Sequence, residues 1–145
     1  HSFSSTTYQY MKVNDREVGE LAIDAAMAGK MGIPVIFASS DDKAVAEVRD
    51  FFGDIQTVTT KQAMGWNAAV SKHPKRAVEE IYESAKLAAS RVSEAEVFSF
   101  EDPLTFEIRY KRIEAAQSAS RGYKGGERVD PYTVRFQLES ISDYY

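Results

Sequence analysis

The sequence predicts an α/β protein in which a layered sheet with flanking helices is followed by a small α+β lobe. Two observations lead to this prediction. Across residues 7–59 the patterns of strand, helix, strand, helix and strand follow one another, which is typical of a parallel or mixed sheet covered by helices. In the second half, residues 104–110 and 133–138 alternate apolar and polar side chains, which indicates strands of an antiparallel sheet.

The elements of the first half follow from amino-acid composition and from residues typical of turns and helix caps. A strand is expected at residues 7–13, which are rich in β-forming side chains and precede an Asn-Asp turn. Residues 18–30 are almost continuously apolar and rich in alanine, so they predict a helix buried between other elements. A short apolar strand is expected at 33–38. Residues 39–42 read SSDD, which predicts the N-cap of a second helix, and a further strand follows at 55–59.

The second half is expected to begin with a helix at His73-Pro74, because proline suits the first helical turn. Ala77, Ile81 and Ala85 then recur at helical spacing. A short helix is predicted at 113–119, between the two alternating strands. We place the boundary between the two halves near residues 65–74.

Composition excludes several classes of function. The 145 residues carry a formal net charge of −4, whereas a general nucleic-acid binder would show a basic patch or stripe. The absence of cysteine excludes disulfides, thiolate metal sites and a cysteine nucleophile. The longest apolar stretches are far shorter than the roughly 20 residues that span a bilayer. We therefore expect a cytoplasmic protein with no nucleic-acid partner and no membrane partner.

Motifs of self-contained catalytic sites are missing. His1 and His73 are the two histidines, and neither belongs to an HExxH pattern, while a catalytic zinc site usually takes three protein ligands. The sequence also holds no Walker-type phosphate loop and no GxSxG nucleophile elbow. His73 is interpreted as a residue of a helix start. These motifs alone leave the activity open.

One residue stands out from its surroundings. Glu20 lies in the first turn of the predicted helix 18–30, which is otherwise almost wholly apolar. It can be an acid that interacts favourably with the positive end of the helix dipole, or a carboxylate that binds a cation. Asp24, four residues later, shares its face and can support such a ligand or mark the solvent edge. The residues themselves leave these interpretations open.

Residues 14–20 read NDREVGE, which resembles the N-G/D-R-x-V-G-E signature of DppA-type D-aminopeptidases. Further segments resemble the same family in the same order. These are His1-Ser2, residues 34–37 with Ser40-Asp41-Asp42, residues 58–68 with Lys61, and residues 126–130 with 133–136. The resemblance therefore covers essentially the whole chain.

The resemblance implies a cytoplasmic, homo-oligomeric zinc aminopeptidase that releases N-terminal D-amino acids from short peptides. Glu20 matches a glutamate that binds one of two zinc ions, and His1 matches the histidine assigned as the catalytic residue. The family's other ligands, an Asp-x-Glu and two later histidines, belong to an N-terminal half that this sequence lacks. We therefore expect the chain to be a C-terminal half that needs the missing half as its partner and is inactive alone.

On this interpretation, residues 1–72 are the C-terminal part of the metal-binding α/β domain, and residues 73–145 are a small α+β lobe for oligomerisation or for forming the pocket. Trp66 stands where the family usually has arginine, so the resemblance does not define the substrate specificity. Two alternatives remain beside the peptidase. One is a non-catalytic binding or oligomerisation module that has lost the metals, and the other is a related metal amidohydrolase acting on a non-peptide amide.

Overall fold

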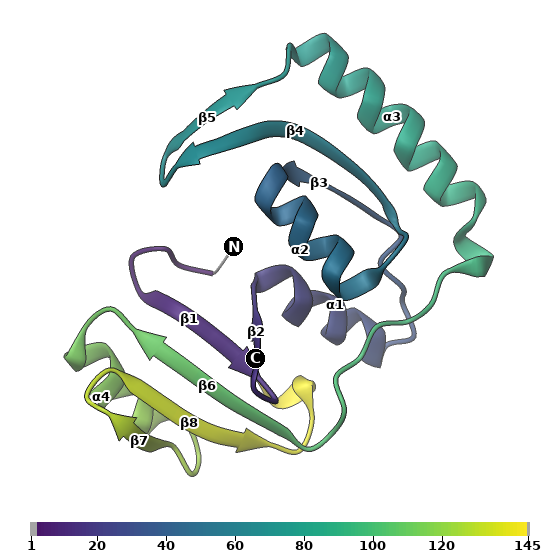
Figure 1. The fold of residues 1–145 in the computed structure, drawn as a ribbon. Coiled ribbons are helices and arrows are strands. Elements are labelled where there is room, and N and C mark those ends of the chain that lie inside the picture. Colours follow the sequence, from purple (N-terminus) through teal and green to yellow (C-terminus); the bar gives the residue numbers. More distant parts are fainter. Residues whose placement is uncertain (1–2, 145) are drawn as a thin grey trace. The chain divides into compact units, whose positions relative to one another are not determined.

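A computed structural model describes residues 3–144 of the chain. In this part of the chain the secondary structure is mixed, with four α-helices and two sheets. Two compact units are present, and the chain visits one of them twice (Figure 1). Unit 1 combines the residues up to Met31 with those from Ser99 onward, and unit 2 is Gly32–Phe98. The predicted α/β class is confirmed.

Unit 1 is built on a five-stranded sheet in the order β2-β1-β6-β8-β7. Every neighbouring pair in this sheet is antiparallel. Its strands are β1 (Tyr8–Val13), β2 (Arg16–Val18), β6 (Leu104–Tyr110), β7 (Glu127–Asp130) and β8 (Thr133–Leu138). The predicted strands at 104–110 and 133–138 are therefore found at the same residues, and that at 7–13 begins one residue later.

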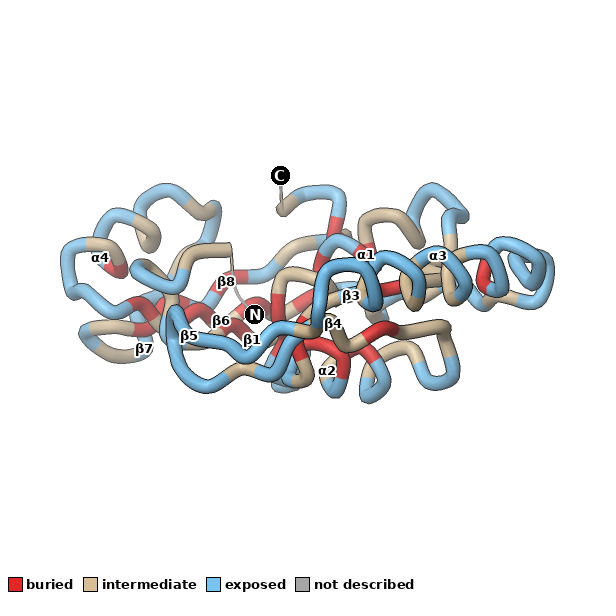
Figure 2. The backbone as a smooth tube through the Cα atoms, turned by 90° about the horizontal axis from the view of Figure 1, so that it is seen from above, coloured by how far each residue is buried: buried red, intermediate tan, exposed pale blue. Residues whose placement is uncertain are grey.

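One face of this sheet forms the core of unit 1. Strand β6 alternates strictly, and Leu104, Phe106, Ile108 and Tyr110 are buried on the same face. The rings of Phe106 and Phe136 stack there with centroids 5.3 Å apart. Figure 2 shows that buried residues concentrate in β1, β6 and β8. The helices of this unit are α1 (Glu20–Lys30), α4 (Ile113–Gly122) and the short 3-10 helix η2 (Ile141–Tyr144).

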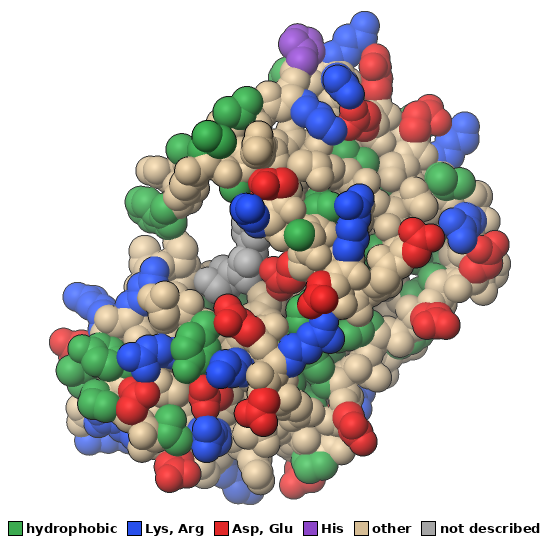
Figure 3. Space-filling model, viewed as in Figure 1, with side chains coloured by type: hydrophobic (Ala, Val, Ile, Leu, Met, Phe, Trp, Pro, Cys, Tyr) green, Lys and Arg blue, Asp and Glu red, His purple; other side chains and the backbone are tan. Residues whose placement is uncertain are grey.

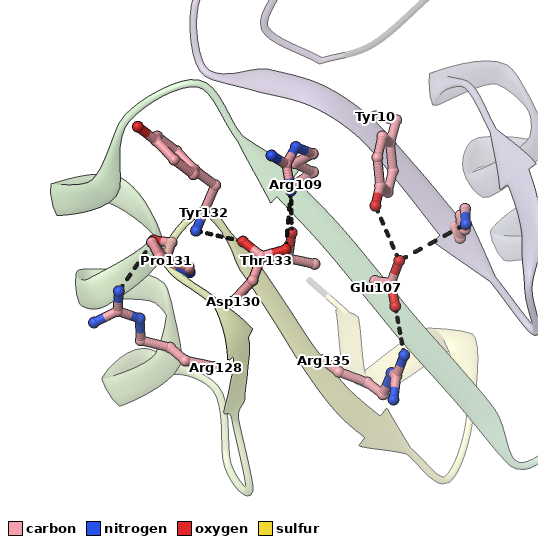
Figure 4. Close-up of polar contacts among 10 residues, drawn as sticks. Tyr10, Glu107, Arg109, Arg128, Asp130, Pro131, Tyr132, Thr133 and Arg135 are labelled. Carbon is pink, nitrogen blue, oxygen red and sulfur yellow. Dashed lines mark hydrogen bonds and ion pairs between the residues drawn. The ribbon is translucent and has the colours of Figure 1, made fainter.

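The opposite face of the sheet carries a row of alternating charges. In the strand register Glu107 of β6 lies between Lys12 of β1 and Arg135 of β8. Arg135 Nη2 donates to Glu107 Oε2 over 2.6 Å, and the hydroxyl of Tyr10 donates to Oε1 over 3.1 Å (Figure 4). Opposite charges directly across a strand pair favour that pairing. The row extends to both outer strands, where Glu17 pairs with Lys12 and Glu127 with Arg135.

Unit 2 contains a three-stranded sheet in the order β3-β4-β5. Strands β3 and β4 are parallel, whereas β4 and β5 form an antiparallel hairpin. Its elements are β3 (Phe37–Asp41), α2 (Asp42–Phe52), β4 (Gln56–Gly65), β5 (Ala68–Ser71), α3 (Pro74–Ser90) and the 3-10 helix η1 (Val92–Glu94). Helices α2 and α3 lie on either side of β4 in Figure 1.

Local capping explains where the helices of unit 2 begin. Asp41 is the N-cap of α2, and its Oδ1 accepts hydrogen bonds from Lys43 N (3.1 Å) and Ala44 N (2.9 Å). Pro74 occupies the first turn of α3, whose 17 residues form an amphipathic helix with Ala88 buried. Both predicted helix starts are confirmed. Along residues 3–144, no helix combines the length and the apolar character needed to cross a membrane.

Some elements differ from those predicted. The strand predicted at 33–38 is found at Phe37–Asp41, because pairing with β4 begins at Phe37 and Pro34 has no N–H to donate to a ladder. Strand β4 runs further than the predicted 55–59, as far as Gly65. Strands β2, β5 and β7 were not predicted, since they are short strands at the edges of the sheets.

The compact units also divide the chain differently from the predicted boundary near residues 65–74. Strand β1 pairs with β6, so residues from both predicted halves share one sheet. Strand β5 lies within the boundary region and belongs to unit 2. As a division of the complete protein, the metal-binding part at 1–72 and the small lobe at 73–145 stay a prediction.

The charge row predicts a pH-dependent contribution to stability. The hydrogen bond from Arg135 lowers the pKa of Glu107, with a further contribution from Tyr10, while partial burial opposes the shift. A carboxylate with a lowered folded-state pKa stabilises the fold above its unfolded pKa of about 4.3, and this stabilisation is lost as the pH falls through the folded value. We expect Glu107→Gln to be less stable than wild type at pH 7, and the difference to shrink below about pH 4.

Urea denaturation followed by circular dichroism between pH 3 and pH 7 measures this difference in the free energy of unfolding. Glu127→Gln is the matched control, because Glu127 is exposed at the outer end of the same row. A Glu107→Gln deficit of equal size at pH 3 and pH 7 would show that the loss is not electrostatic.

Candidate functional site

The NDREVGE segment forms a tight hairpin that leads directly into α1. Asn14 and Asp15 have φ angles of 49° and 64°, which suits a type I′ turn between antiparallel strands. Asparagine and aspartate tolerate this left-handed conformation better than most residues do. Val13 pairs with Arg16 across the turn, so β2 returns along β1.

The Asn14 side chain fastens this turn to the beginning of β6. Its Nδ2 donates to the carbonyl oxygen of Glu101 over 2.9 Å, and its Oδ1 accepts from Thr105 N over 2.8 Å. The Asn14 N–H also donates to the Thr105 carbonyl oxygen over 2.9 Å. Residues about ninety positions apart in the chain thereby hold the hairpin in place. The first residue of the signature has a structural role that the sequence did not show.

Glu20 is the first residue of α1 and is half-buried. The N-cap is Gly19, which has an extended backbone and supplies no side-chain hydrogen bond to the first turn. The free N–H groups of a first turn attract negative charge, so a carboxylate is favourable there. Val18, two residues before Glu20, and Ile23, three residues after it, are both buried, so the backbone is anchored on either side of Glu20. This position suits both open interpretations, the helix acid and the metal ligand.

The body of α1 is buried on one side, whereas its alanine-rich sequence predicted a helix buried between other elements. Ala22, Ile23, Ala25 and Ala26 are buried. Asp24 is exposed, so it lies at the solvent side of the helix. Lys30, at the other end of the helix, forms an ion pair with Asp102. The helix that carries Glu20 is thus held at both ends by residues of unit 1.

The other predicted site residue, His1, lies outside the described residues. The described segment next to it is held by several contacts within unit 1. Tyr8 N donates to the carbonyl oxygen of Ser4 over 3.0 Å, and Lys111 N donates to that of Thr7 over 3.0 Å. The ring of Phe3 lies 6.1 Å from that of Tyr144. The segment that follows His1 and the helix of Glu20 therefore belong to the same unit.

The metal-binding capacity of the described residues is small. Within residues 3–144, His, Asp and Glu side chains form no group of three or more that could hold a metal ion. A half-buried carboxylate at a helix start suits a zinc ion as one oxygen ligand among several. Further ligands for a site at Glu20 would have to come from residues beyond this part of the chain.

Other residues singled out in the sequence have structural positions. His73 is the exposed N-cap residue of α3, and its carbonyl oxygen accepts from Ala77 N over 3.1 Å, which confirms it as a helix-start residue. Gly126 has no room for a side chain, because a Cβ would lie 2.8 Å from the Ser120 carbonyl oxygen. Trp66 lies between β4 and β5 and is 78% exposed.

Sequence reasoning did not single out Glu107, although its side chain is 14% exposed and contacts three polar partners. Acidic residues on the outer face of a strand are common, so the pattern of β6 alone gives no signal. The signal that could have found it is the opposite charge at the paired positions of β1 and β8. That signal requires the strand register, which the structure supplies.

Comparisons with known proteins agree with this fold. A family model described as D-aminopeptidase, peptidase family M55, matches residues 1–145. A D-aminopeptidase of Bacillus subtilis (strain 168) is 24% identical over 137 residues, which cover 94% of this chain and 50% of that protein.

The Zn-dependent D-aminopeptidase DppA from Bacillus subtilis, a self-compartmentalizing protease, matches in structure with a TM-score of 0.87 at 24% identity. This match covers 97% of the chain and 51% of that structure, and it supports the fold. The chain thus spans about half the length of the relatives it matches. Because the family match runs from the first residue to the last, the chain belongs to the D-aminopeptidase family of peptidases.

Proposed function

We propose that this chain is part of a zinc-dependent aminopeptidase that releases N-terminal D-amino acids from short peptides. One observation carries the proposal: Glu20, half-buried at the start of α1, follows a family signature that the structure folds into a fixed hairpin. The family match over the whole chain supports the peptidase class, and a relative with the same fold is described as Zn-dependent.

In the proposed site, Glu20 is a ligand of one of two zinc ions. Bound zinc polarises the scissile carbonyl and lowers the pKa of an attacking water. His1 would move a proton during the reaction or contact the tetrahedral intermediate, because an imidazole titrates near neutral pH. The remaining ligands would come from the part of the complete protein that this chain does not include. On this proposal the chain alone is inactive.

The proposal includes assembly. The relative DppA is described as a self-compartmentalizing protease, and we propose that the complete protein containing this chain is likewise a homo-oligomer, located in the cytoplasm. Assembly of several copies around an enclosed site would restrict access to short peptides, which agrees with the proposed substrate. The enzyme and its assembly can be tested separately.

A second candidate is a non-catalytic binding or oligomerisation module. It is favoured by the absence of any group of three potential ligands within the described residues. A related metal amidohydrolase acting on a non-peptide amide is the third candidate. Zinc content of the complete protein separates the module from both enzymes, and hydrolysis of D- and L-aminoacyl peptides against simple amides separates the two enzymes.

The role of Glu20 predicts the effect of its removal. We expect Glu20→Ala, in the complete protein, to lose zinc from each subunit and to lose D-aminoacyl peptide hydrolysis with it. Zinc by atomic emission and hydrolysis rates are measured on the same samples. Glu114→Ala is the matched control, because Glu114 is an exposed acid in the first turn of α4 and has the same relation to a helix dipole.

Both variants lose a favourable interaction with a helix dipole, which is typically about 0.3–1 kcal/mol. If Glu20→Ala keeps its zinc and activity and only loses stability as Glu114→Ala does, Glu20 is a helix acid and not a ligand.

The role of His1 predicts a different result. We expect His1→Ala in the complete protein to keep its zinc, because the proposed role is catalytic, while kcat falls about 10²- to 10⁴-fold. The limb of the pH–rate profile near a histidine pKa of about 6.5 should disappear as well. His73→Ala, the change at the other histidine of the chain, should leave zinc, kcat and the profile unchanged. Loss of zinc in His1→Ala would instead make His1 a ligand.

A further inference from the structure

The position of Glu20 depends on the hairpin that precedes it. Glu20 is the first residue of α1, and the N-cap Gly19 supplies no side-chain hydrogen bond to the first turn. The N–H groups of a first turn have no partner within the helix, so capping bonds normally fix where the turn lies. The buried side chains of α1 begin with Ala22, after Glu20. The chain that leads into α1 therefore has a direct influence on where the Glu20 carboxylate lies.

That chain is joined to the sheet by a short strand. Strand β2 has three residues, lies at the edge of its sheet beside β1, and leads directly into α1 (Figure 1). Arg16 and Glu17 are exposed, and Val18 is the buried residue of the three. A strand of this length forms few ladder bonds, since a typical strand has about five or six residues. A second attachment would fix the helix start more firmly.

The Asn14 side chain supplies that attachment. Val13 pairs with Phe106 in the register of β1 and β6, so Asn14 and Thr105 are the next pair. In such a pair, two antiparallel residues normally exchange both backbone bonds. The Asn14 N–H donates to the Thr105 carbonyl oxygen over 2.9 Å, and Thr105 N donates to the side-chain Oδ1 of Asn14 over 2.8 Å. The side-chain oxygen thus takes the place of a backbone carbonyl and extends the ladder into the turn.

The segment that receives these bonds also contacts the other end of α1. Asn14 Nδ2 donates to the Glu101 carbonyl oxygen over 2.9 Å. Asp102, the next residue, forms an ion pair with Lys30 in the last turn of α1. A cation interacts favourably with the helix dipole at this end of a helix. Residues 101–105 therefore hold both the turn before α1 and its last turn, and all these residues belong to unit 1.

We propose that Asn14 is a positioning residue for zinc: its two side-chain bonds hold the hairpin on residues 101–105 and thereby hold Glu20 where it binds the metal. Asn14 acts through the backbone that joins it to Glu20. The inference rests on the proposed function, because it takes Glu20 as a zinc ligand. It adds a determinant of zinc affinity that lies in the second half of the chain.

The expected size of the effect follows from how a mobile ligand binds. If the start of α1 samples several positions, only the fraction with Glu20 in place binds zinc, and the dissociation constant rises in inverse proportion to that fraction. Removal of a group that orients a metal ligand typically costs roughly 10- to 100-fold in metal affinity or activity. Asn14 acts through several intervening residues, so we expect the lower end of this range, about 10-fold.

The test compares Asn14→Gly with Asp15→Gly in the complete protein. Both positions have a left-handed backbone, which glycine adopts readily, so each variant keeps the turn and loses one side chain. The side-chain bonds to Glu101 and Thr105 are lost in Asn14→Gly and kept in Asp15→Gly. We expect the dissociation constant for zinc to rise about 10-fold in Asn14→Gly and to keep its wild-type value in Asp15→Gly.

Competition with a zinc chelator measures these constants. Figure 3 shows acidic side chains scattered over the visible face of the protein, and such carboxylates bind zinc weakly. A chelator that removes the weakly bound metal restricts the measurement to the tight site.

Hydrogen exchange of the metal-free protein gives a readout that does not involve zinc. We expect the amides of residues 23–27 in α1 to exchange faster in Asn14→Gly than in Asp15→Gly, because the start of the helix opens more often. Acceleration by the same factor in α1 and in β8, residues 133–138, would show a general loss of stability and no positioning role.

Asn14→Asp provides a graded variant and serves if Asn14→Gly fails to fold. Aspartate tolerates the left-handed backbone and keeps an oxygen that accepts from Thr105 N, but it has no N–H to donate to Glu101. We expect its zinc affinity to lie between those of wild type and Asn14→Gly. An affinity no better than that of Asn14→Gly, or, where that variant does not fold, a loss of about 10-fold or more from wild type, would show that the bond to Thr105 does not position Glu20.

The outcomes separate this inference from the proposed function. If Glu20→Ala keeps its zinc, the proposed site is wrong and the positioning role is removed with it. If Glu20→Ala loses its zinc while Asn14→Gly binds zinc as tightly as Asp15→Gly does, Glu20 remains a ligand and the positioning role alone is wrong. Equal weakening in the two glycine variants would assign the effect to the turn backbone, which also contradicts a role for the Asn14 side chain.

Discussion

The two faces of β6 impose the constraint on which unit 1 depends. Leu104, Phe106, Ile108 and Tyr110 fill the core, while Glu107, on the other face, is held between Lys12 and Arg135. A shift of one residue in the register would turn Glu107 into the core and a large apolar side chain out of it. The apolar face supplies most of the stabilisation, and the charge row penalises the alternative registers. Together they fix which residues of β1 and β8 lie beside β6.

This constraint also determines the position of Glu20. Once β1 is paired with β6, the Asn14 turn reaches Glu101 and Thr105 and is bonded to both. The direction of β2 and the start of α1 then follow from the turn and from Gly19. The family signature can therefore be understood as a device that places a carboxylate at a helix start. Within the signature, Asn14 and Asp15 form the turn and Asn14 bonds it to β6, while Glu20 is the residue proposed as a metal ligand.

Within unit 2, the part of the sheet that helices cover differs in burial from the part that they do not cover. In unit 2 the parallel pair β3–β4 has helices packed against it, and Ala38 of β3, Val58 of β4 and Val45 and Val48 of α2 are buried. Strand β4 continues as far as Gly65, and its residues from Lys61 onward are exposed except for the half-buried Ala63. Glu20 lies in unit 1, which is a different unit from that of the β4–β5 hairpin.

The sequence by itself determined the elements whose signals are local. Strict alternation located β6 and β8, and the SSDD cap and His73-Pro74 located the starts of α2 and α3. The ordered motifs of the chain also led to the family. Propensity, capping and periodicity act over a few residues, which is why these predictions succeeded.

Only the tertiary structure decided how these elements are combined. The pairing of β1 with β6 joins residues about 90 to 100 positions apart, so the chain forms two compact units of which the continuous unit 2 interrupts unit 1. The edge strands β2, β5 and β7 exist because a neighbouring strand pairs with them, and their own residues show no distinctive pattern. The role of Glu107 likewise depends on the strand register and on which face of the sheet is covered. Such properties belong to pairs of segments, so no single stretch of sequence contains them.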